Sequence, residues 1–181
     1  SGERMGEVGP LLGGDWTASK QLPKMLKVVG AMKEAGVKRV GVLGFCYGGW
    51  LGMHLAKEVD LVCGASPHPS VHVEGMVGGD PGALAAESKC PWALFPCGVL
   101  GGEGSDPDIY DAAGAVYNSL EERHAGKNVT KRFASMAHGF VTRGSIKADE
   151  FNAGTGDEVK AAVQECIENI TEFFGARGLL S

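Results

Sequence analysis

The sequence lacks the segments and the charge that membrane or nucleic-acid proteins carry. No apolar run in its 181 residues approaches the roughly 18 residues of a membrane-spanning helix. The opening SGERMGEVGP has no apolar stretch of the kind found in signal peptides. The formal net charge is -5, and the Lys and Arg residues are scattered. These absences argue against nucleic acid and membranes as partners, and we expect a cytoplasmic protein.

The five cysteines contain no C-x-x-C pair. Their odd number and irregular spacing do not indicate a disulfide framework, and a structural zinc site or thioredoxin-like motif is not expected. A site built from Cys63, His68 and His72 is conceivable, but strand and loop geometry gives no reason to expect it. We therefore predict no metal and no cofactor. Four of the cysteines are expected to be buried thiols: Cys63, Cys90, Cys97 and Cys166.

The composition, 44% hydrophobic and 22% charged, is that of a globular protein. Its 29 glycines show no period, and no internal repeat is visible. The length suits one domain over 1–181. The opening residues read as a loop rather than a strand, so we expect a chain that is truncated or only partly represented at its N-terminus.

Strand and helix patterns alternate along the chain. This alternation is typical of an α/β domain, with a parallel sheet flanked by helices. Continuous apolar runs predict strands buried on both faces. The predicted strands are 39–45, 91–99 and 129–136, and the stretch 61–70 is expected to begin as a strand and to break at its prolines. The predicted helices are 18–37, 48–59, 109–126 and 157–178, with one short helix within 72–89. The last long helix is expected to bury Val159, Val163, Cys166, Ile167, Ile170 and Phe174.

Three stretches follow predicted strands and should meet at the carboxyl edge of the sheet: GFCYGG, GEGSDPD and MAHGF. In the first, a sharp strand-to-helix turn would present Cys46, with Gly44 and Gly48 leaving room for the close approach of the chain. The following helix points its N-terminus at Cys46, which favours a thiolate. The backbone N–H of Tyr47 would face a developing oxyanion. The simpler alternative is a buried cysteine in a glycine-rich turn.

The other two stretches supply partners for this cysteine. His138 follows a strand where a general base would stand. Asp106 or Asp108 follows another strand where an acid would orient that histidine, and we prefer Asp106. The chain order of nucleophile, acid and base is that of α/β-hydrolases.

These residues resemble the dienelactone hydrolase family (carboxymethylenebutenolidase-like) of the α/β-hydrolase superfamily. The resemblance rests on GVLGFCYGG, PWALFPCG with the acidic loop after it, and MAHGF, and it covers the chain from about Trp16 to the end. It implies hydrolysis of small-molecule lactones or activated carboxylic esters through a Cys-His-Asp triad and a thioester, without a cofactor. Cys46 would be the nucleophile, His138 the base and Asp106 the orienting acid.

The chain departs from the family pattern in three places. One is the acidic loop, which is longer and richer in glycine than the simple Gly-x-x-Asp turn of the family. Nothing in 1–20 resembles the strands that precede the elbow strand in the family, so we expect an α/β-hydrolase-like sheet that lacks them. Arg143 lies near, but out of register with, an arginine that holds the substrate carboxylate. His68, in ASPHPS, matches a segment near the family's active site. We assign both residues to substrate binding.

Two other interpretations remain open at this point. A degenerate hydrolase fold could serve as a non-catalytic binding module, indifferent to thiol alkylation. Class I glutamine amidotransferases and DJ-1-like proteins also present a cysteine at an elbow, but MAHGF lacks the His-Pro-Glu pattern of the amidotransferases. We rank this third.

Overall fold

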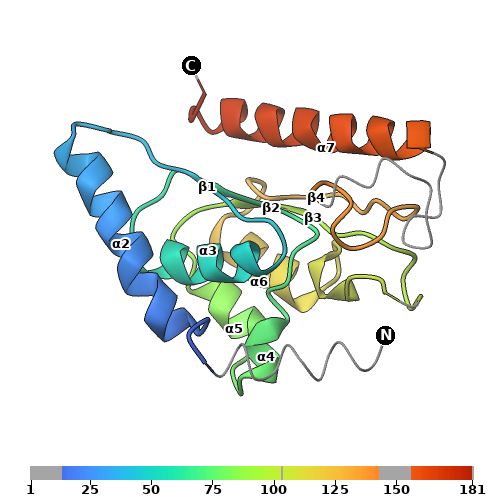
Figure 1. Cartoon of the computed structure of the whole chain (residues 1–181), viewed down its shortest axis with the longest axis horizontal. Helices are drawn as coiled ribbons and strands as arrows, with labels where there is room; N and C mark the ends of the chain where they lie inside the picture. Colours follow the sequence, from blue (N-terminus) through green and yellow to red (C-terminus); the bar gives the residue numbers. More distant parts are fainter. Residues whose placement is uncertain (1–13, 103, 143–155, 181) are drawn as a thin grey trace.

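The protein is built around a parallel four-stranded sheet with strand order β1-β2-β3-β4 (Figure 1). The computed structural model describes residues 14–102, 104–142 and 156–180. The strands are short: β1 (Val42–Leu43), β2 (Gly64–Pro67), β3 (Trp92–Phe95) and β4 (Val129–Thr130). The predicted α/β class, a parallel sheet flanked by helices, is confirmed.

The helices cover the sheet unequally. The C-terminal helix α7 runs along one face, and the other helices gather on the opposite side (Figure 1). None of the helices within the described ranges combines the length and the apolar character that crossing a membrane requires. The helices are α2 (Ala18–Glu34), α3 (Tyr47–Glu58), α4 (Val73–Met76), α5 (Pro81–Ala86), α6 (Ala115–Arg123) and α7 (Gly156–Ala176), and Asp108–Tyr110 forms the 3-10 helix η1.

Strand β3 shows why the strands read as continuous apolar runs. Successive side chains of a strand point to opposite faces. Trp92 and Leu94 join the core beneath α2, α3, α5 and α6, whereas Ala93 and Phe95 join the core beneath α7. All four are fully buried. A strand covered on both faces favours apolar side chains along its whole length.

Several predicted elements differ in extent. The helix predicted over 109–126 begins only at Ala115. Gly114, which precedes it, packs against the backbone of η1, where an added Cβ would lie 2.2 Å from the Asp108 carbonyl oxygen. The stretch 72–89 holds two short helices instead of one.

Helix α7 buries a slightly rotated stripe. Val159, Cys166 and Ile170 are buried as predicted, but Ile167 is 46% exposed. Ala162 and Phe173 take the remaining buried positions. Val163 and Phe174, which were also predicted to be buried, are only partly buried.

Candidate active site

Cys46 stands at the turn between β1 and α3. Its backbone has φ 52 and ψ -123, a left-handed conformation that is strained for a residue with a side chain. The turn brings Gly44 so close to the helix that a Cβ there would lie 2.2 Å from the Gly48 carbonyl oxygen. A Cβ on Gly48 itself would meet no atom within 4 Å, so the prediction that both glycines make room is wrong for Gly48.

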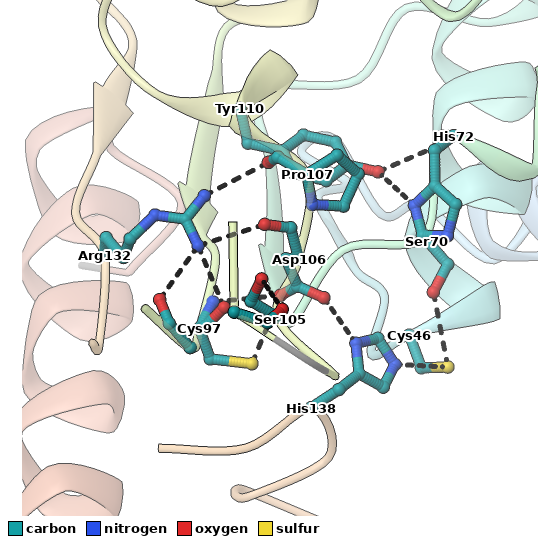
Figure 2. A network of polar contacts seen from close by, with 12 residues as sticks. Cys46, Ser70, His72, Cys97, Ser105, Asp106, Pro107, Tyr110, Arg132 and His138 are labelled. Carbon is teal, nitrogen blue, oxygen red and sulfur yellow. Dashed lines mark hydrogen bonds and ion pairs between the residues drawn. The ribbon is translucent and has the colours of Figure 1, made fainter. Parts of the chain in front are cut away.

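Three of the predicted side chains meet at the carboxyl edge of the sheet (Figure 2). The Nε2 atom of His138 lies 3.0 Å from the sulfur of Cys46. On the other side of the imidazole, Nδ1 lies 2.6 Å from a carboxylate oxygen of Asp106. The imidazole therefore stands between a thiol and a carboxylate, within the range expected of a nucleophile, a base and an orienting acid.

The pKa values of the thiol and the imidazole move in opposite directions. Burial raises the pKa of Cys46, but hydrogen bonding by neighbours, His138 first, more than offsets this and lowers the pKa to about 5. Burial lowers the pKa of His138, but its contacts with Asp106 and Cys46 raise the pKa to about 9. At neutral pH the pair is therefore a thiolate and an imidazolium, with Nε2–H donating to the sulfur.

The acidic loop brings Asp106, and not Asp108, to the histidine. The side chain of Asp106 is 2% exposed. Its second carboxylate oxygen accepts hydrogen bonds from the backbone N–H of Cys97 at 2.9 Å and from the Cys97 thiol at 3.2 Å. Asp108 is exposed at the start of η1. Both oxygens of the Asp106 carboxylate are thus engaged, which fixes its orientation toward His138.

Arg132 holds this acidic loop in place, and its role was not predicted from the sequence. Its guanidinium donates to the carbonyl oxygens of Cys97, Gly98, Asp106 and Pro107 at 2.9 to 3.1 Å. It also pairs with the Asp111 carboxylate, at 2.6 Å for the shortest contact. The only signal in the sequence was a cationic side chain in a segment expected to be a buried strand, where a charge needs partners.

The segment after β2 adds two further polar side chains to the site (Figure 2). The hydroxyl of Ser70 donates to the sulfur of Cys46 at 3.4 Å. The backbone N–H of His72 donates to the Tyr110 hydroxyl at 2.9 Å, and its Nδ1 lies 2.8 Å from the same oxygen. Burial lowers the pKa of His72. Ser70 was missed although it follows a strand at the same sheet edge, because a serine after two prolines reads first as a turn residue.

The remaining predicted site residues have different outcomes. The N–H of Tyr47 belongs to the first residue of α3, where helix geometry leaves it without an intrahelical partner. His68 is fully buried beside His138, with its ring centroid 5.1 Å from that of His138. Arg143 lies outside the described residues. The substrate-binding roles of His68 and Arg143 stay predictions.

Cys97, Asp106 and His138 also satisfy the spacing of a metal site, since one ligand atom from each lies within 4.8 Å of the others. The two hydrogen bonds that Asp106 accepts, from Cys97 and His138, account for this closeness. Burial raises the pKa of the Cys97 thiol, and Asp106 raises it further. A protonated, enclosed thiol is a poor metal ligand, so the cluster fits an oriented acid and base better than a metal centre.

Comparison with known proteins identifies a family for the chain. A model of the dienelactone hydrolase family matches residues 15–178. The matched region includes the elbow, the acidic loop and His138. No curated protein and no solved structure matches the chain in the same comparison.

Proposed function

Since the chain belongs to the dienelactone hydrolase family, within the α/β-hydrolase superfamily, we propose that it cleaves lactones or activated carboxylic esters with Cys46 as the nucleophile. The family supports a hydrolase of the dienelactone hydrolase type. One observation carries the finer proposal: the His138 imidazole lies 3.0 Å from the Cys46 sulfur and 2.6 Å from the buried Asp106 carboxylate.

In the first half of the proposed reaction, the Cys46 thiolate attacks the carbonyl carbon of the ester. The carbonyl oxygen becomes an oxyanion, which the N–H of Tyr47 stabilises at the N-terminus of α3. The tetrahedral intermediate then collapses with cleavage of the bond to the leaving oxygen. That oxygen takes the proton from Nε2 of His138, which leaves a thioester on Cys46 and a neutral imidazole.

In the second half, the neutral His138 takes a proton from a water molecule that attacks the thioester. The second tetrahedral intermediate expels the Cys46 thiolate and releases the carboxylic acid. His138 has kept the proton from water, so the original thiolate and imidazolium are restored. Asp106 accepts the hydrogen bond of Nδ1–H throughout and keeps the imidazole in the required tautomer.

The chemistry of a thiolate nucleophile favours particular substrates. A thiolate is a better leaving group than an amine or an alkoxide, so a tetrahedral intermediate returns to reactants unless the other leaving group departs easily. Enol-lactones and aryl esters meet this condition more readily than amides. Small lactones and activated esters are therefore the proposed substrate class.

Hydrolysis of an activated ester and of an enol-lactone tests the proposal. The wild-type protein should show a burst of product, and mass spectrometry should find the acyl group on the Cys46 peptide. Cys46→Ala should abolish both signals. His138→Ala should lower kcat by at least about 10²-fold, the low end of general base catalysis. His54→Ala, a matched change at a histidine paired with Glu74, should leave kcat nearly unchanged.

The opposite pattern would favour a binding module over a hydrolase. In that case the wild-type protein would give no burst with either substrate. The Cys46→Ala and His138→Ala variants would then match the wild-type protein in every assay.

A further inference from the structure

His68 combines two features that each carry an energetic cost. It is one of two non-glycine residues with positive φ in the described part of the chain, at φ 37, and the other is Cys46. Its side chain is fully buried, and neither ring nitrogen has a hydrogen-bond partner among the described residues. Buried polar groups normally find partners, and strained backbone clusters at functional sites. The fold therefore holds an unpaired imidazole on a strained backbone at a specific place.

That place is directly behind the nucleophile. The backbone N–H of Cys46 donates to the Pro67 carbonyl at 3.4 Å, and the N–H of Ser70 donates to the Cys46 carbonyl at 3.2 Å. These two bonds fasten the segment to the elbow on both sides of His68. The His68 ring packs edge-on against the ring of His138, with centroids 5.1 Å apart, so it lies beside the imidazolium of the thiolate–imidazolium pair.

We infer that His68 is a positioning residue that directs a ring N–H toward the sulfur of Cys46 and, together with Ser70, helps to hold the nucleophile as an anion. The inference rests on the proposed role of Cys46 as a thiolate nucleophile. It gives the buried ring a task other than direct contact with substrate.

The electrostatics of the thiol agree with this role. Burial raises the pKa of Cys46, whereas the side chains of His138, His68 and Ser70 lower it. The ring nitrogens of His68 fall outside the distance and angle of a formed hydrogen bond. Catalytic hydrogen bonds are often long in a free enzyme and shorten in its complexes.

Titratable groups surround the sulfur on several segments. His138 approaches it from the loop after β4, Asp106 stands behind His138 on the loop after β3, and His72 lies on the same segment as His68. A neutral imidazole still offers one N–H. His68 can therefore stabilise the thiolate without bringing another positive charge to the site.

Titration of the Cys46 thiolate in three variants tests the inference. His68→Phe keeps a ring for the contact with His138 but removes both nitrogens. His68→Asn and His68→Gln keep an N–H donor at different reach, and asparagine also tolerates a left-handed backbone. Thiolate absorbance and the pH profile of alkylation by iodoacetamide both report the pKa of Cys46, with no need for turnover.

His68→Phe should raise the pKa of Cys46 by about one to two units, the effect of one hydrogen bond to a charged group. At least one of the two amide variants should restore most of the shift. Ser70→Ala removes a hydroxyl donor that lies 3.4 Å from the sulfur, and the change it causes in the pKa of Cys46 gives the size of the effect of a single donor. His54→Phe, the same change on α3 at a histidine bonded to Glu74, should leave the pKa unchanged.

An unchanged pKa in His68→Phe, or equal shifts in all three variants, would overturn the inference. If His68→Phe does not fold, NMR of the His68 ring nitrogens in the wild-type protein decides. Alkylation of Cys46 removes the thiolate and should move their resonances, and unmoved resonances would also overturn the inference. If the Cys46 thiolate responds to the His68 variants as predicted but the wild-type protein hydrolyses neither substrate, the proposed function is refuted and this inference stands.

Discussion

At the scale of single residues, Cys46 differs from the other cysteines in the ionisation of its thiol. Its pKa is lowered to about 5, whereas burial raises the pKa of Cys63 to about 11 and those of Cys90 and Cys166 to about 12. Because the thiolate is the reactive form, limited iodoacetamide at neutral pH should label Cys46 well before the other thiols. Peptide mapping would detect this order, and uniform labelling would contradict it.

The acidic loop offers a matched pair of substitutions two residues apart. Asp106→Asn removes the carboxylate that holds Nδ1–H of His138 and helps to raise the pKa of that imidazole to about 9. It should lower kcat by orders of magnitude, by about 10⁴-fold if the wrong tautomer dominates as in serine proteases. The alkaline limb of the kcat/KM profile should move to lower pH. Asp108→Asn, at an exposed position, should change neither quantity.

A large loss of activity in Asp108→Asn alone would show that the acid is assigned to the wrong residue. A loss in both variants would indicate damage to the loop as a whole. Circular dichroism of each variant separates these outcomes, since only the second accompanies a change in fold.

At the scale of elements, the two glycines that flank Cys46 in the strand-to-helix turn differ in the space around them. A Cβ on Gly44 would overlap backbone atoms of Gly48 and Gly49, which a rotation of a side chain cannot relieve. Gly44→Ala should therefore destabilise the fold by about 1–3 kcal/mol, as overpacking does, and lower activity. Gly48→Ala meets open space and should be neutral or stabilising by up to about 1 kcal/mol. Urea unfolding of both variants measures the difference, and equal losses would contradict it.

The acidic loop depends in a similar way on Arg132. Its side chain is 11% exposed and ties four backbone carbonyls to Asp111. Arg132→Gln should cost about 1–3 kcal/mol through unpaired buried acceptors and lower kcat as Asp106 loses its fixed position. Expressed as free energies, the change in the pKa of Cys46 should be smaller than the change in kcat.

The adjacent Lys131 provides the control for that substitution. Its ion pair with Glu165 is exposed on both sides, and exposed pairs contribute about 0–1 kcal/mol. Lys131→Gln should therefore leave both stability and kcat nearly unchanged. A similar loss of kcat in both variants would remove the special role given to Arg132.

The sequence predicted those parts of the site that depend on local rules. A glycine-flanked cysteine between a strand and a helix, and a histidine after a later strand, follow from turn and strand signals alone. Arg132 and Ser70 escaped prediction because their roles depend on backbone carbonyls and a sulfur distant in sequence. The open space around Gly48 was not predicted either, because only the packed turn shows which glycine is crowded.

At the scale of the whole molecule, the sheet order explains why the site assembles. The four strands lie in their order along the chain, all parallel. The segments that follow them therefore lie side by side and contribute, in turn, Cys46, Ser70, Asp106 and His138. Alternating patterns indicate a parallel sheet, but they do not give the order of its strands. The single-domain organisation over 1–181 and the cytoplasmic location stay predictions.

The thiolate–imidazolium pair also links the site to the stability of the whole fold. Folding lowers the pKa of Cys46 from 9.0 to about 5, so its contribution is present above pH 9 and is lost as the pH falls through 5. Folding raises the pKa of His138 from 6.5 to about 9, so its contribution is present below pH 6.5 and is lost as the pH rises through 9. Between pH 6.5 and 9 the folded and unfolded pairs bind equal numbers of protons, so the net contribution of the pair rises only between about pH 5 and 6.5.

Cys46→Ser removes the thiol titration and leaves the other ionisable groups in place. The free energy of unfolding of the wild-type protein, minus that of Cys46→Ser, should rise as the pH increases from about 5 and level off before about pH 9. Urea unfolding at a series of pH values measures this difference. Cys90→Ser is the matched control, because the pKa of Cys90 is raised to about 12 and its thiol stays protonated throughout. A wild-type curve parallel to that of Cys46→Ser would mean that no thiolate forms in the folded protein, whatever its activity toward esters.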